Sequence, residues 1–217
     1  MQLFRRFSPD EAEMHSREGL HYLDRRKKEF NFNLAVENLK EAIKLGPEVG
    51  KYHHELGRAY ATAPLLAVTR GISDGFVISE SIELAVDELT KALKFDSSQA
   101  ETYLVLGEAF MYLGKKRRAI EAFQAAVSVG SSSFLSISPL QFIDGLLLKS
   151  CANRRIKYLE QGTGEQPRPG VAQESIKRAI LYRDEKRYNL ADRELLQAFK
   201  LAPDWAWLYK TICKLAG

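Results

Sequence analysis

Large and small residues alternate at helical spacing between residues 103 and 126, which predicts two packed helices. Small residues at Gly107 and Ala119 allow two antiparallel helices to cross closely. Phe110 and Phe123 fill the space on either side of that crossing. The full pattern comprises Tyr103, Leu106, Gly107, Phe110, Ala119, Phe123 and Ala126. Packing accounts for each position, so the segment predicts a helical hairpin.

The same pattern recurs on both sides of this hairpin. Gly19 and Leu39 occupy matching positions upstream, with about four extra residues between the two helices. Gly57 and Leu89 also match, although about sixteen extra residues separate their halves. Residues 179–198 repeat the pattern at the unmodified spacing, although Ser175 and Arg178 stand where bulky apolar residues are usual. The sequence therefore predicts four hairpins, over residues 12–47, 48–97, 98–133 and 171–203.

On these residues the chain resembles the tetratricopeptide-repeat family, most completely over 100–133, at regular spacing over 172–205 and with insertions over 12–97. The resemblance implies a right-handed α-solenoid whose first helices line a concave groove that holds peptides, helices or folded partners. It implies no reaction. We therefore expect an all-α solenoid of about four hairpins with an inserted segment, an extra long helix and a C-terminal capping helix.

The inserted segment spans residues 61–81 and carries many aliphatic side chains. Pro64 is expected to stop the preceding helix, and Ser79 or Ser81 to cap the next one. Such an apolar segment either folds back on the solenoid as a lid or presents an apolar patch to another chain. We favour the lid, because exposed apolar patches are uncommon in soluble proteins.

Two further segments follow the third hairpin. Ser138 and Pro139 predict the start of an extra helix over 138–161 that continues the stack, and glycines and prolines predict a linker over 162–170. Residues 204–217 are expected to form a helix that covers the last hairpin. Trp205 and Trp207 cannot share one side of that helix, so one is expected at an edge, where the alternative role is anchoring a partner.

Composition agrees with a binding protein. The chain has 217 residues and 45% hydrophobic residues, which excludes global disorder. Cys151 and Cys213 lie far apart and form no metal-ligand spacing, which indicates reduced, buried thiols and favours a cytoplasmic location. We expect no secretory signal, transit peptide or membrane span, because acidic residues follow the N-terminus and no run of about eighteen apolar residues occurs.

The predicted groove has a mixed surface with an aliphatic and aromatic centre, which suits an apolar helix or extended segment of a partner protein. Its residues are His54, Arg58, Leu104, Val105, Glu108, Met111, Tyr112, Ile176, Lys177, Ile180 and Arg183. Family members that clamp a chaperone's C-terminal carboxylate carry Lys, Asn and Arg at set groove positions. Here those positions hold Ser16, Leu20, Glu55, Glu101 and Val105, which argues against chaperone-tail binding.

Basic residues gather near the turns within the hairpins and predict a basic edge along the solenoid. They are Arg25, Arg26, Lys27, Lys28, Lys115, Lys116, Arg117, Arg118, Lys186 and Arg187. The edge is either simply solvated, with cations favouring the dipole at the end of a first helix, or it contacts an acidic protein, nucleic acid or anionic surface. We favour the solvated edge, because acidic residues interrupt it and the net charge is only +4.

Catalytic motifs are missing from the sequence. His53, His54 and Glu55 form the only local cluster of ligand types, and neighbouring residues on a helix point about 100° apart. We therefore expect no metal, no cofactor and no enzymatic activity. The favoured hypothesis is a protein-binding scaffold, as an assembly factor or structural subunit of a larger complex. The alternatives are RNA or anionic-surface binding through the basic edge, and a noncatalytic regulatory subunit of an enzyme.

Overall fold

A computed structural model describes residues 9–24, 29–71, 78–132, 152–161, 168–202 and 205–216, and all regular structure in these ranges is helical. The α-helices are α1 (Pro9–Leu23), α2 (Phe32–Leu45), α3 (Gly50–Arg70), α4 (Ser81–Phe95), α5 (Ala100–Tyr112), α6 (Lys116–Ser132), α8 (Pro169–Asp184), α9 (Tyr188–Leu201) and α10 (Trp205–Ala216). A short 3-10 helix, η1 (Ile78–Glu80), precedes α4, and residues 152–161 are also helical. The predicted all-α solenoid is confirmed.

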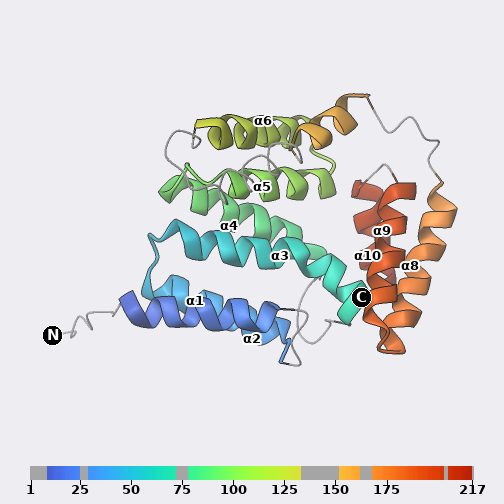
Figure 1. The fold of residues 1–217 in the computed structure, drawn as a ribbon, viewed down its shortest axis with the longest axis horizontal. Helices are drawn as coiled ribbons and strands as arrows, with labels where there is room; N and C mark the ends of the chain where they lie inside the picture. Colours follow the sequence, from blue (N-terminus) through green and yellow to red (C-terminus); the bar gives the residue numbers. More distant parts are fainter. Residues whose placement is uncertain are drawn as a thin grey trace.

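Helices α1 to α6 form a stack of three hairpins (Figure 1). Helix α1 pairs with α2, α3 with α4, and α5 with α6, while α2–α3 and α4–α5 contacts join successive pairs. The first helices of neighbouring hairpins also touch, because α3 contacts both α1 and α5. The inner surface of the stack is therefore built mainly from α1, α3 and α5.

One packing rule fixes the register of all three stacked hairpins. In each, a glycine of the first helix lies against a large side chain of the second. The pairs are Gly19 with Leu39, Gly57 with Leu89, and Gly107 with Phe123. A Cβ atom added at these glycines would lie 2.7, 2.7 and 2.5 Å from the partner side chain, closer than any real contact. The predicted close crossing is confirmed, although the nearest neighbour of Gly107 is Phe123 and not Ala119.

Helix α3 continues through the inserted segment, so the expectation that Pro64 ends it is wrong. Pro64 lies inside α3, which ends at Arg70, where Gly71 adopts a φ of 68° and donates to the carbonyl of Ala67. An interior proline costs about 3 kcal/mol. Burial of Leu66 and Val68 offsets this, because a buried aliphatic side chain contributes about 1.5 to 3 kcal/mol.

The extension of α3 supports a C-terminal unit formed by α8, α9 and α10. These helices run across the direction of α1–α6 (Figure 1), and all three contact α3. Val68 of α3 is fully buried in a second core cluster with Ile176, Ile212 and neighbouring residues of the unit. Within the inserted segment, the end of α3, residues 64–70, is thus a platform for the C-terminal unit of the same chain.

The remaining segments differ in detail from the prediction. Residues 152–161 pack against the main core through Ala152, Ile156 and Leu159, whereas residues 138–151 lie outside the described ranges. Helix α8 begins at Pro169, so the last residues of the predicted linker are helical, because proline suits the first helical turn. The terminal helix α10 contacts α3 and α5 in addition to α8 and α9. The side chains of both tryptophans lie outside the described residues.

Candidate protein-binding groove

The centre of the predicted groove is filled by the chain itself. Met111 and Tyr112 are only 5% and 6% exposed, and the Tyr112 ring meets that of Phe199 from α9 edge to face, with centroids 6.2 Å apart. Cys213 of α10 packs against the same core cluster. Burial raises the pKa of the Tyr112 hydroxyl well above its usual range, and Glu108 adds to this. The expectation that these residues present a binding surface is corrected, because α9 and α10 lie where a partner was expected.

Other predicted groove residues of α5 are also engaged. Leu104 and Val105 are partly buried against the main core. Glu108 accepts a hydrogen bond of 3.2 Å from Nη2 of Arg155, which lies in the helical segment 152–161. This segment and the C-terminal unit thus cover part of the inner side of α5.

The fourth hairpin does not continue the groove. Ile176 is fully buried and Ile180 partly buried in the second core cluster. Arg183 donates to the carbonyl of Ala67 at 3.0 Å, which ties α8 to the end of α3. Of the four residues predicted on α8, Lys177 alone is exposed, and it pairs with Glu174. The physical reason is the crosswise orientation of α8, which turns its predicted inner face toward α3.

Polar side chains on α3 connect the first helices instead of facing a ligand. Buried Glu55 accepts a hydrogen bond from Ser16 of α1. His54, 7% exposed, forms a hydrogen bond of 2.8 Å between its Nδ1 and the hydroxyl of Thr102 on α5. Burial lowers the pKa of His54, although Glu101 opposes the shift. His54 is thus an inter-hairpin contact, which corrects its assignment to the groove surface.

The predicted cluster of His53, His54 and Glu55 separates into three unrelated contacts. The Nδ1 of His53 lies 2.6 Å from Oε2 of Glu88, and its Nε2 lies 2.9 Å from the carbonyl oxygen of Pro47. His54 and Glu55 bond to other helices, as described above. Among the described residues, no three His, Cys, Asp or Glu side chains come together to hold a metal ion.

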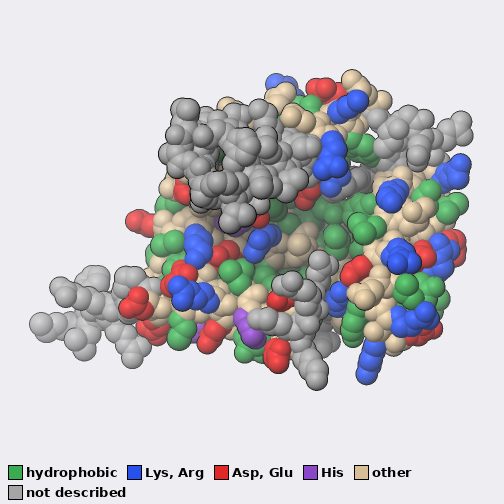
Figure 2. Space-filling model, viewed as in Figure 1, with side chains coloured by type: hydrophobic (Ala, Val, Ile, Leu, Met, Phe, Trp, Pro, Cys, Tyr) green, Lys and Arg blue, Asp and Glu red, His purple; other side chains and the backbone are tan. Residues whose placement is uncertain are grey.

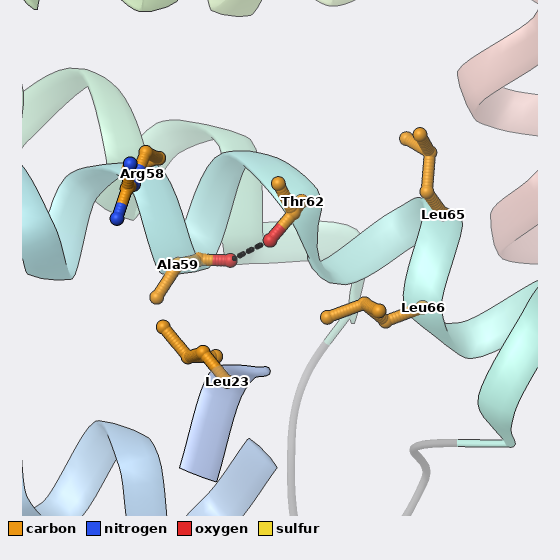
Figure 3. A pocket seen from close by; sticks show the side chains of 6 residues that line it. All are labelled: Leu23, Arg58, Ala59, Thr62, Leu65 and Leu66. Carbon is orange, nitrogen blue, oxygen red and sulfur yellow. Dashed lines mark hydrogen bonds between the residues drawn. The ribbon is translucent and has the colours of Figure 1, made fainter. Parts of the chain in front are cut away.

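An open hollow remains on the inner side, between the end of α1 and the middle of α3 (Figure 3). It has a volume of about 210 Å³ and is lined by Leu23, Arg58, Ala59, Thr62, Leu65 and Leu66. In Figure 3 the Leu23 side chain points from α1 toward Ala59, and Leu66 points back toward the same space. Thr62 is exposed, and its hydroxyl donates to the carbonyl of Ala59 at 2.9 Å.

Arg58 is the one predicted groove residue that lines this open hollow. Leu23 and Thr62 were not predicted from the sequence. Yet Leu23 comes one residue after the aromatic residue of its first helix, as Met111 comes after Phe110, and Thr62 comes two residues after its own, as Tyr112 does. Leu65 and Leu66 were missed because Pro64 was expected to end the helix before them. The hollow opens beside the junction with the C-terminal unit, where Figure 2 shows hydrophobic side chains gathered in the recess between that unit and the stack.

The predicted basic edge is not continuous. Lys115, Lys116, Arg117 and Arg118 are all exposed at the α5–α6 turn, and Lys186 and Arg187 are exposed at the α8–α9 turn. The α8–α9 turn precedes the N-terminal end of α9, whereas Phe199 lies near its C-terminal end. Phe199 contacts Tyr112, which lies beside the α5–α6 turn. The two basic turns therefore lie at opposite ends of α9. Residues 25–28, the remaining part of the predicted edge, fall outside the described ranges.

The basic residues at the α5–α6 turn also lie at the wrong end of a helix dipole. Lys116, Arg117 and Arg118 occupy the first turn of α6 and not the end of α5. A cation there is unfavourable by about 0.3 to 1 kcal/mol, because the N-terminus of a helix carries partial positive charge. Arg117 is compensated by an ion pair with Glu121 at 3.1 Å. The prediction that these cations favour the dipole at the end of a first helix is therefore wrong at this turn.

Replacing Glu55 with Gln is expected to stabilise the protein at pH 7 by about 1 kcal/mol, because a buried carboxylate is removed while its hydrogen-bond acceptor stays. Burial raises the pKa of Glu55, and the hydrogen bond from Ser16 opposes the shift. A raised folded pKa means that the wild-type protein gains stability below the unfolded pKa, about 4.3, and loses it as pH rises through the folded value. The gain from Glu55→Gln should thus shrink on acidification. Melting temperatures at several pH values test this, and equal gains at pH 4 and 7 would contradict it.

The comparison with protein families agrees with the hairpin geometry. Residues 100–129, which span α5 and most of α6, match the family model described as Tetratricopeptide repeat. No curated protein matches the chain. In the described residues, no helix combines the length and the apolar character needed to cross a membrane.

Proposed function

We propose that this chain, in which residues 100–129 match the tetratricopeptide-repeat model, is a non-enzymatic scaffold that binds a segment of another protein in the open hollow between α1 and α3. The supporting observation is the hollow itself, which lies on the side of the stack lined by first helices. Such a scaffold serves as an assembly factor or a structural subunit of a larger complex, in the cytoplasm, where its two cysteines stay reduced.

The size of the hollow favours one side chain over a small molecule. Small-molecule sites usually measure about 300 to 1,000 Å³, whereas this hollow measures about 210 Å³. Its walls are mainly aliphatic, from Leu23, Ala59 and Leu66. An apolar anchor residue of a partner segment therefore fits it best, in the way that buried anchors dominate other protein interfaces.

Arg58 favours an acidic residue next to that anchor. The Arg58 guanidinium lies 3.5 Å from Glu101, and both side chains are substantially exposed. An exposed pair of this kind contributes only about 0 to 1 kcal/mol, so a carboxylate from a partner can compete for the guanidinium. The preferred partner segment thus carries an apolar residue flanked by Asp or Glu. Glu55 stands at one of the positions that family members use to clamp a chaperone's C-terminal carboxylate, but it is buried and itself carries a carboxylate. This supports the prediction that such a tail is not the ligand.

A second candidate is binding of RNA or another anionic surface at the α5–α6 turn. It is favoured by the four exposed cations whose position at a helix N-terminus brings no dipole stabilisation. It is weakened by the separation of the two described basic turns, which form no continuous basic track for a polyanion between them.

Selection from a phage-displayed library of random peptides tests the first proposal. We expect selected peptides to share an apolar residue beside Asp or Glu, and Thr62→Trp, which fills the hollow, to weaken their binding by about tenfold or more, roughly 1.4 kcal/mol. Fluorescence anisotropy of labelled peptides measures the loss. Thr90→Trp is the matched control, since exposed Thr90 of α4 likewise donates to a helix carbonyl, that of Val86.

The same assay separates the candidates. Unchanged peptide binding by Thr62→Trp, or failure to select any peptide, would remove the support for a partner site in the hollow. Labelled single-stranded RNA is the second probe: binding that falls steeply with salt would favour the anionic alternative, with a slope near −0.7 per phosphate contact.

A further inference from the structure

The terminal helix α10 lies in an unexpected place for a capping helix. It follows the fourth hairpin, yet it contacts α3 and α5, the first helices of the second and third hairpins. Ile212 is fully buried in the second core cluster, whereas the next residue, Cys213, packs against the main cluster. Neighbouring residues of a helix point about 100° apart, so α10 is wedged between the two clusters on the inner side of the stack.

The surface beneath α10 is the one that the repeat register assigns to ligand binding. Helix α10 contacts both α3 and α5 there. At the border of this surface, Tyr112 of α5 meets the ring of Phe199 from α9, and Leu65 of α3 packs against both core clusters. Peptide recognition often uses an amphipathic helix that binds in a groove. Here that helix, α10, belongs to the same chain as the groove.

The C-terminal unit is tied to the stack by a small group of arginine contacts at the end of α3. Arg70 donates to Asp192 of α9 at 3.0 Å through Nη2, and its guanidinium lies 4.7 Å from the ring centroid of Tyr188. Arg183 of α8 donates to the carbonyl of Ala67. The Arg70 side chain is 9% exposed, so this ion pair is poorly screened and sensitive to loss of either partner.

We propose that the surface of α3 and α5 beneath α10 is a helix-binding site, that α10 is its intramolecular ligand, and that an amphipathic helix of a partner protein replaces α10 there. The proposal extends the scaffold function from the open hollow to the covered half of the groove. Arg70 holds α9 against α3, and α9 contacts α10, so release of the Arg70 contacts shifts the equilibrium toward the uncovered state. The apparent affinity for an external helix rises in proportion to the fraction of uncovered protein.

Reactivity of Cys213 reports whether α10 leaves the surface. In a full-length Cys151→Ser background Cys213 is the single thiol, and it is partly buried against the core. We expect Arg70→Met to increase its alkylation rate by about tenfold, because local opening exposes groups in proportion to its equilibrium constant. Asp192→Asn, which breaks the same pair from the other side, should act in the same direction.

Arg187→Met is the matched control. Arg187 also pairs with an acid, Glu185, and also lies over a tyrosine ring, that of Tyr182 at 5.0 Å. Both of these contacts lie within the α8–α9 hairpin, so loss of Arg187 should leave the alkylation rate of Cys213 nearly unchanged. Equal effects of Arg70→Met and Arg187→Met would overturn the proposal.

A labelled peptide of residues 205–216 serves as the external helix. It should bind full-length Arg70→Met about tenfold more tightly than wild type, and a peptide carrying Ile212→Asp should lose binding. Hydrogen exchange must show that α1–α6 stay protected in the variant. Loss of protection throughout the stack, or absence of peptide binding to the opened variant, would overturn the proposal. Leu65 borders both surfaces, but neither readout depends on Thr62, so failure of this proposal is distinct from failure of the proposed function.

Discussion

Phe123→Ala should lower the free energy of unfolding by about 3 to 5 kcal/mol, the usual cost of truncating a fully buried phenylalanine. Phe123 is 0% exposed and lies against Gly107, where a Cβ atom would come within 2.5 Å of its ring. The ring thus fills the crossing between α5 and α6. Its removal leaves a cavity that a glycine, having no side chain, cannot fill.

Urea unfolding followed by far-ultraviolet circular dichroism measures this loss. Phe95→Ala is the matched control, because Phe95 is 40% exposed at the end of α4, where its ring stacks on that of His53. We expect its cost to stay below about 1 kcal/mol. Equal destabilisation by the two substitutions would contradict the packing assigned to the third hairpin.

The stacked hairpins could be predicted from sequence because their packing is local. A glycine in one helix and a large residue about sixteen or more positions later meet across a single turn, as Gly107 meets Phe123. The pairing of a glycine with a large residue sets the register even when extra residues separate the two helices, as for Gly57 and Leu89. Each hairpin then stacks on its neighbour, which is how solenoids build a core.

The position of the C-terminal unit could not be predicted in this way. It depends on contacts such as that of Arg70 with Asp192, which are 122 positions apart in the chain. No local period encodes such a pair. One signal was present: Arg178 stands where Leu106 is buried in the third hairpin, and in the structure it is exposed and pairs with Glu194. An arginine there indicates that α8 has no hairpin stacked on that face.

The groove prediction failed where the regular stack ends. Assigning Met111, Tyr112 and Ile176 to a partner surface assumed that four hairpins follow one axis, which leaves the inner face open. The C-terminal unit instead runs across the direction of the stack (Figure 1), and its helix α10 contacts α5. Between α1 and α3, where the stack is regular, Arg58 lines an open hollow.

Ile176→Ala separates the two descriptions of α8. A side chain on an exposed groove surface changes stability by less than about 0.5 kcal/mol when truncated. Ile176 is instead 0% exposed, in the second core cluster with Val68 and Ile212. We therefore expect Ile176→Ala to lower the free energy of unfolding by about 2 to 5 kcal/mol.

Lys177→Ala is the neighbouring control, because Lys177 is exposed and its ion pair with Glu174 lies within one helix, where such pairs contribute about 0.2 to 0.5 kcal/mol. Hydrogen exchange of Ile176→Ala should also show faster exchange in α8–α10 than in α1–α6, since the cavity opens in the second cluster, which contacts the stack through the end of α3. A melting temperature equal to that of Lys177→Ala would contradict the burial of Ile176 and favour the prediction that the fourth hairpin lines the groove.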